Sequence, residues 1–115
     1  MLPRKYEIYL AAIPLRGNTV RHNWLVVESA SPSPHDHFFQ RVGALPISSE
    51  EALFDDHLHF PLRRIDLDFP RTGLWLNSYV IGDEPTLIPI DRLLFIRGEL
   101  LGELLDEFTE WREQH

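Results

Sequence analysis

Apolar and polar residues alternate along most of this chain, a pattern that predicts a protein built mainly of short β-strands. In residues 5–13, KYEIYLAAI, the side chains of Ile8, Leu10 and Ala12 share one face, and we expect Pro14 to end this strand. Further runs of the same character predict five more strands, at residues 24–28, 38–45, 58–65, 74–81 and 87–90.

Prolines and turn residues set the expected boundaries of these strands. Pro46 is expected to stop the third strand, and Pro61 makes the fourth an edge or bulged strand because proline cannot donate to a sheet ladder. Residues 15–23 predict a polar loop, and residues 29–36, with two Ser-Pro steps, predict another. Residues 48–54 open with serines followed by acids, which indicates a short helical or turn segment.

The C-terminal region, residues 93–115, is the one convincing helical pattern. Gly98 and Gly102 lower helix propensity at the start of this region, so its main helix is expected to begin near Glu99. A single apolar stripe at spacings of three and four is formed by Leu101, Leu104, Leu105, Phe108 and Trp111. We therefore expect a mainly β fold, a curved antiparallel sheet or small β-barrel, with a C-terminal α-helix packed on it.

Length and composition indicate one globular domain covering residues 1–115. The absence of cysteine excludes disulfides and thiolate chemistry, and no apolar run approaches the ~20 residues of a membrane span, so a cytoplasmic protein is expected. The formal net charge of -7 argues against strong non-specific polyanion binding but allows a local basic groove.

The stretch 73–92 delivers an acid, Asp83, to the end of a predicted strand. A rigid strand followed by a break is one way to present a carboxylate to a substrate. The same pattern also fits a plain hairpin with a polar turn. Both interpretations remain open from the residue pattern alone.

Six histidines raise the question of a metal site. In a strand, His57 and His59 would share one face, and Asp36 or Asp55 could add a third ligand. A second pair of closely spaced histidines, His35 and His37, flanks Asp36. Because no longer motif constrains their spacing, we expect loop and strand-end histidines, with neither metal nor cofactor.

A second chemical possibility is metal-free cleavage of RNA, in which the substrate's own 2′-hydroxyl is the nucleophile. The protein then supplies a base, an acid and a cation. Residue types suited to these tasks are Arg21, His22, Ser48, Ser49 and Asp83. Aromatic side chains could stack on bases; of the tryptophans, Trp24 and Trp111 are expected in the core, which leaves Trp75 as the candidate.

Taken in order, four segments resemble the PemK/MazF toxin family. These are RKYEIYLAAIP, RHNWLVVES, ALPISS and TGLWLNSYVIGDEPTLIPIDRL, of which the last is the most specific because its order extends over about 20 residues. The family comprises small, metal-independent, homodimeric endoribonucleases of toxin–antitoxin systems. The resemblance implies an SH3-like CcdB/PemK fold, single-stranded RNA as substrate, a cognate antitoxin as partner and a homodimer, with no membrane association.

The resemblance also implies roles for individual residues. Asp83 matches the acid that serves in proton transfer, Ser48 or Ser49 falls where a residue contacts the scissile phosphate, and His22 falls at the arginine before the second strand, with Arg21 beside it. Substrate-binding residues are then Arg16, Arg21 and Trp75.

Three positions depart from the family pattern by losing positive charge or adding negative charge. Ile81 stands two residues before the acid, where members often have arginine; Glu84 replaces a glutamine and Thr86 an arginine. These departures support an alternative function, a catalytically weak or inactive PemK/CcdB-like module that binds and regulates a protein partner.

Overall fold

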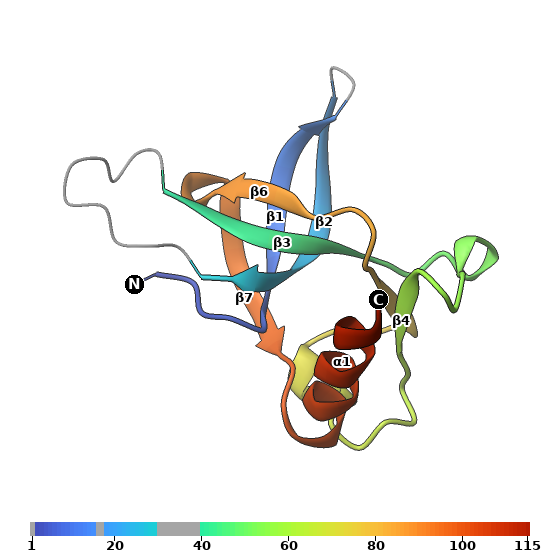
Figure 1. The fold of residues 1–115 in the computed structure, drawn as a ribbon. Coiled ribbons are helices and arrows are strands. Elements are labelled where there is room, and N and C mark those ends of the chain that lie inside the picture. Colours follow the sequence, from blue (N-terminus) through green and yellow to red (C-terminus); the bar gives the residue numbers. More distant parts are fainter. Residues whose placement is uncertain (1, 16–17, 30–39) are drawn as a thin grey trace.

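The protein consists of an antiparallel sheet and a C-terminal helix in a computed structural model that describes residues 2–15, 18–29 and 40–115 (Figure 1). Its strands are β1 (Glu7–Leu15), β2 (Asn18–Glu28), β3 (Arg41–Ser48), β4 (His59–Leu62), β5 (Ser78–Ile81), β6 (Thr86–Pro89) and β7 (Leu93–Glu99). Short 3-10 helices are η2 (Glu51–Leu53), η3 (Phe69–Thr72) and η4 (Ile90–Arg92), and the α-helix is α1 (Gly102–Gln114). The expected mainly β architecture with a terminal helix is confirmed.

The strands form one sheet in the order β4-β5-β3-β2-β1-β7, and β6 pairs with β3 beside β5. In the part of the chain that the structure describes, β4 pairs only with β5, and β7 only with β1. The sheet therefore has two open ends, and closure into a barrel is wrong for these strands. The edge position expected for the strand around Pro61 is confirmed by β4.

The β1–β2 hairpin is longer than predicted. Pro14 lies inside β1, and β2 begins at Asn18, so Arg21 and His22 are strand residues rather than loop residues. They pair with Ala12 and Ala11. A proline is tolerated there because β7 pairs with β1 only as far as Ala11 and requires no N–H from the later residues.

Pro46 also lies within a strand, contrary to the predicted stop. It sits in β3 opposite Trp24. β6 pairs with β3 at residues 41–44 and β5 at residues 47–48, so Pro46 lies between the two where that side of β3 has no strand partner. The missing N–H therefore costs no ladder bond on that side.

Residues 93–99 form strand β7 and not the start of the helix, which is a correction to the helical prediction. An apolar run of this length fits either a strand or a buried helical turn, and pairing with β1 decides in favour of the strand. The helix then begins at Gly102 rather than near Glu99. Asp68, from a distant loop, accepts a hydrogen bond from the Leu104 N–H at 3.5 Å and so partly satisfies the helix start.

The remaining predicted strands are confirmed with shorter or shifted bounds. β5 covers only the last four residues of the predicted strand 74–81, β6 occupies residues 86–89, and the expected segment 48–54 contains η2. Of the loop expected at residues 29–36, all but Ser29 lie outside the described residues, as do residues 16–17 of the loop expected at 15–23.

Packing on the two faces of the sheet gives two cores. On one face α1 lies beside β4 (Figure 1), and its predicted apolar stripe is confirmed by the burial of Leu104 and Phe108 against Phe60 and Val80. The other core consists of Ala11, Trp24, Val26, Val42, Ala44 and Ile88. Trp24 is thus a core residue, and Trp111 packs at the margin of the helix core, as predicted.

The turn after η3 is locked against β7. Gly73 has a φ of 72°, and a Cβ added there would lie 2.0 Å from the Arg97 carbonyl oxygen. Glycine is needed at this position for both its left-handed backbone and this close approach. The contact places Gly73 directly against the main chain of Arg97. Within the described residues, none of the helices is long and apolar enough to cross a membrane.

Candidate functional site

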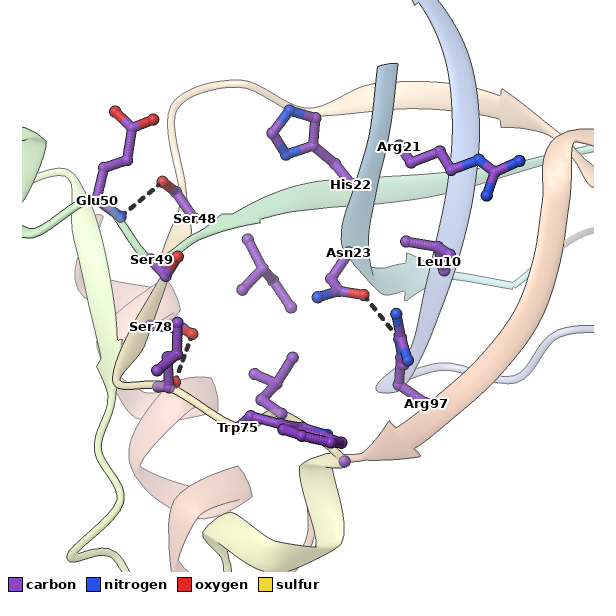
Figure 2. A pocket seen from close by; sticks show the side chains of 14 residues that line it. Leu10, Arg21, His22, Asn23, Ser48, Ser49, Glu50, Trp75, Ser78 and Arg97 are labelled. Atoms are coloured by element: carbon purple, nitrogen blue, oxygen red, sulfur yellow. Dashed lines mark hydrogen bonds between the residues drawn. The ribbon is translucent and has the colours of Figure 1, made fainter. Parts of the chain in front are cut away.

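A cavity of about 540 Å³ opens on the sheet between β2, the end of β3, β7 and the segment 73–78 (Figure 2). We call it the groove. Residues from five parts of the chain line it: Leu10, Arg21, His22, Asn23, Ile47, Ser48, Ser49, Glu50, Gly73, Leu74, Trp75, Leu76, Ser78 and Arg97. In Figure 2, Ser48, Ser49 and Glu50 stand on one side, and Asn23 and Arg97 on the other.

Most of the residues singled out in the sequence meet in this groove. Arg21 and His22 reach it from β2, Ser48 and Ser49 from the end of β3, and Trp75 from the segment after Gly73. The last predicted substrate-binding residue, Arg16, lies outside the described residues. The convergence brings together side chains that are up to 54 positions apart in sequence, from Arg21 to Trp75.

Asp83 does not line the groove. It is exposed on the turn after β5, where the neighbouring Gly82 donates its N–H to the Leu58 carbonyl and lies against the Trp111 ring. Only the opposite end of β5, at Ser78, contributes to the groove. Ser78 and Ile81 are three strand steps apart, about 10 Å, so the turn that carries Asp83 lies beyond the strand end distant from the groove.

Arg97 is a groove cation that the sequence analysis did not select. Its guanidinium Nε donates to Asn23 Oδ1 at 3.3 Å, and its central carbon lies 4.6 Å from the centre of the Phe95 ring. In the sequence, Arg97 stands out as a charged residue within the apolar run 93–99. Because this run was predicted to be helical, Arg97 was not expected on the sheet. As a strand residue, Arg97 reaches the same cavity as His22.

The basic side chains of the groove have no carboxylate partner in the described part of the chain. None of Arg21, His22 and Arg97 forms an ion pair with an Asp or Glu side chain among residues 2–15, 18–29 and 40–115. The whole chain has 18 acidic residues against 11 Lys and Arg, so acids are plentiful. Cations gathered in one cavity and left without internal partners are available for an external anion.

Serine hydroxyls add polar groups to the same cavity. Ser48 Oγ accepts a hydrogen bond from the Glu50 N–H at 3.2 Å, which leaves its own proton available to a ligand oxygen. Ser78 instead donates its hydroxyl proton to the Leu76 carbonyl at 2.7 Å. Of these two hydroxyls, Ser48 is the one suited to contact a phosphate.

Trp75 gives the groove an apolar platform. Its side chain is 84% exposed and the neighbouring Leu76 is 60% exposed, whereas Trp24 is buried. A large aromatic ring that packs on little of its own protein offers a stacking surface to a base. Trp75 thus differs from Trp24 in its exposure, and its role in binding a substrate stays a prediction.

The histidine cluster has a structural role in the described region. His59 Nδ1 accepts a hydrogen bond from the Asp55 N–H at 2.9 Å, and the His57 N–H donates to Asp55 Oδ1 at 2.9 Å. No group of three His, Asp or Glu side chains suited to a metal ion occurs among the described residues. The remaining candidates, His35, Asp36 and His37, lie outside them.

Comparison of the sequence with protein-family models and with curated proteins found no match. The residues of the groove are therefore the basis for assigning a function. Their chemistry, two guanidinium groups, an imidazole, a free hydroxyl and an exposed indole, is suited to a phosphate joined to an aromatic base.

Proposed function

We propose that this protein is a toxin-like endoribonuclease that cleaves single-stranded RNA in the groove without a metal ion. One observation carries the proposal: Arg21, His22 and Arg97 line one cavity and have no carboxylate partner in the described part of the chain. Phosphate groups of a nucleic acid are the anions that such a set of cations binds most readily.

The exposed Trp75 favours a single strand as the ligand. Base stacking on an aromatic side chain requires a base that is not already stacked and paired in a duplex. Trp75 and the two arginines line the same cavity, so a base on the indole and its phosphate beside a guanidinium can be bound together. Binding of this kind tolerates many sequences, because every base has a π-face.

RNA rather than DNA is the proposed substrate for cleavage because the 2′-hydroxyl supplies the nucleophile. Arg21 and Arg97 would stabilise the charge that develops on the phosphorane, and Ser48 would donate to a non-bridging oxygen. Protonated His22 would give its proton to the leaving 5′-oxygen. The carboxylate chosen from the sequence as the base, Asp83, does not line the groove.

These assignments agree with the resemblance to PemK/MazF toxins for Arg21, His22 and Ser48. We extend the proposal to an SH3-like CcdB/PemK fold, a homodimer in the cytoplasm and a cognate antitoxin that blocks the groove. The open ends of the sheet at β4 and β7 leave strand edges that another chain can pair with.

The location of Asp83 outside the groove favours a second candidate function. A groove that keeps its cations but lacks the expected base would bind RNA or a partner peptide without cutting it. The residues Ile81, Glu84 and Thr86 agree with this alternative, because none of them supplies a cation near the acid.

The test is incubation of the purified chain with a labelled single-stranded RNA of mixed sequence in EDTA. Cleavage to products with 2′,3′-cyclic phosphate ends is expected, while a DNA of the same sequence is bound and left intact. Arg21→Ala and His22→Ala should lose cleavage, and Arg112→Ala, an exposed arginine on α1, should keep it. Binding without cleavage would support the second candidate, and neither binding nor cleavage would refute both.

A further inference from the structure

We propose that Glu50 is the general base of the RNA cleavage and that Tyr79 is the residue that positions it; this inference rests on the proposed ribonuclease function. Attack of the 2′-oxygen of RNA on the adjacent phosphorus needs a group that removes the proton of the 2′-hydroxyl. Sequence reasoning assigned that task to Asp83, which is outside the groove. The structure places a different carboxylate at the groove itself.

Glu50 is the acid that borders the groove. Among the described residues that line the cavity, it alone has a carboxylate. It follows Ser48 and Ser49 at the end of β3, and Figure 2 shows it on the serine side of the cavity with its carboxylate directed away from the other lining residues. His22, the proposed acid, reaches the cavity from β2. The groove therefore has both a carboxylate, suited to act as the general base for the 2′-hydroxyl, and an imidazole, suited to act as the general acid for the leaving 5′-oxygen.

The main chain of Glu50 is fixed on both sides of its α-carbon. The Glu50 N–H donates to Ser48 Oγ at 3.2 Å, and the Tyr79 hydroxyl donates to the Glu50 carbonyl oxygen at 2.8 Å. The second bond joins residues 29 positions apart in sequence. It also lies next to the register that pairs Tyr79 with Ser48 across β5 and β3.

Tyr79 is itself held rigidly. It is 4% exposed, its ring stacks on His59 with centroids 4.8 Å apart, and Phe54 meets it edge-on at 5.5 Å. A buried tyrosine has little freedom to move its hydroxyl, so its bond fixes the start of the Glu50 side chain. The packing of Tyr79 against His59 and Phe54 therefore helps to fix the main chain of Glu50 at the edge of the groove.

The carboxylate of Glu50 is free to accept a proton. In the described part of the chain it has neither an ion pair nor a hydrogen bond, and the residue is exposed. Fixed main chain and free carboxylate together allow the side chain to turn into the cavity that it borders. Repulsion between this carboxylate and the incoming phosphate is offset by Arg21 and Arg97, which line the same cavity.

The reaction then balances with the residues of the groove. Glu50 takes the proton of the 2′-hydroxyl, the 2′-oxygen forms a bond to phosphorus, and the bond from phosphorus to the 5′-oxygen breaks. Protonated His22 gives its proton to that leaving oxygen. The products are a 2′,3′-cyclic phosphate and a 5′-hydroxyl, and proton exchange with water restores Glu50 and His22.

The first test compares Glu50→Gln with wild type and with Asp83→Asn on the same labelled RNA. Glu50→Gln should lower kcat by about 100-fold or more, because the group that takes the 2′-proton is lost. Its affinity for an uncleavable single-stranded DNA should be retained or rise modestly, since no binding cation is lost and one negative charge is removed. Glu50→Asp should recover part of the rate, and Glu107→Gln on α1 serves as an exposed control.

The second test addresses Tyr79 through Tyr79→Phe, which removes one hydroxyl and keeps the buried ring. We expect kcat to fall by about 3–10-fold with KM and DNA affinity unchanged, because a main-chain anchor of the base is lost. A fall in thermal stability with kcat unchanged would show a purely structural role and refute the positioning assignment.

The outcomes separate the two proposals. An active wild type with an equally active Glu50→Gln, or a larger loss in Asp83→Asn than in Glu50→Gln, would overturn the assignment of Glu50 and leave the ribonuclease intact. A wild type that binds RNA and never cleaves it would overturn both. Loss of cleavage in Glu50→Gln with DNA binding retained supports the inference.

Discussion

Asn23 on β2 accepts a hydrogen bond from the guanidinium of Arg97 on β7, although the two residues are 74 positions apart. They lie on either side of β1, whose Leu10 pairs with Asn23 on one side and with Phe95 on the other. Because Asn23 takes the Nε proton, the two terminal nitrogens of Arg97 remain available for a phosphate. The sheet therefore orients a cation at the groove.

This relationship predicts different effects for the two partners. Arg97→Ala should weaken binding of single-stranded RNA or DNA by about tenfold and lower the slope of log affinity against log salt by about 0.7, because one phosphate contact is lost. Asn23→Ala should weaken binding by only about threefold and keep the slope, since the charge remains. Fluorescence anisotropy across a salt series measures both quantities. An unchanged slope in Arg97→Ala would contradict phosphate contact by Arg97.

The exposed indole predicts a separation of binding from stability. Trp75→Ala should weaken single-stranded RNA binding by about 1–3 kcal/mol, the usual value of one stacked base. The free energy of unfolding should change by no more than about 0.5 kcal/mol, because the side chain is 84% exposed. Ile65→Ala is the matched control, since Ile65 is 87% exposed and does not line the groove. Equal affinities of the two variants would rule out stacking on Trp75.

The contact between Gly73 and β7 predicts a large cost for one added methyl group. Gly73→Ala should lower the free energy of unfolding by about 2–5 kcal/mol, through left-handed strain and a clash with the Arg97 carbonyl. Gly43→Ala is the control, because the nearest atom to its added Cβ is Glu28 Cβ at 3.1 Å, and it should cost less than about 1 kcal/mol. Urea denaturation measures both, and similar costs would contradict the tight approach at Gly73.

Tyr9 predicts a loss of stability at alkaline pH. Burial raises its pKa above 10.0, and the Glu7 carboxylate raises the pKa further by its charge and by a hydrogen bond from the Tyr9 hydroxyl at 3.3 Å. A raised pKa in the folded state means that the contribution of Tyr9 is complete below pH 10 and is lost as the pH rises toward the folded pKa. The stability of Tyr9→Phe should fall less steeply above pH 10 than that of wild type, as measured by urea denaturation, and an equally steep fall would contradict this role of Tyr9.

Local patterns in the sequence were sufficient for much of the fold. Alternation in residues 5–13 and the strand propensity of residues 24–28 predicted strands, and the spacing of Leu104 and Phe108 predicted the buried face of α1. Such patterns succeed because a strand or helix with one buried face repeats its apolar residues at a fixed period. They failed at residues 93–99, where an apolar run has no clear period and pairing with β1 decided the structure.

The candidate site could be predicted only in part. Residue types suited to phosphate chemistry pointed to Arg21, His22 and Ser48, and these three do line one cavity. Arg97 was missed because its strand was assigned to a helix, and Glu50 because nothing in its local sequence distinguishes it from the acids around it. Membership of the groove depends on which strands are neighbours, a property that no local pattern contains.

The sequence by itself determined that this chain is mainly β with a terminal helix, that Trp24 and Trp111 pack inward, and that it has residue types suited to RNA. The tertiary structure alone decided that Arg97 joins His22 across β1 and that Asp83 lies beyond the strand end distant from the groove. The physical reason is that periodicity reports which face of an element is buried, whereas pairing register between distant strands determines which side chains meet.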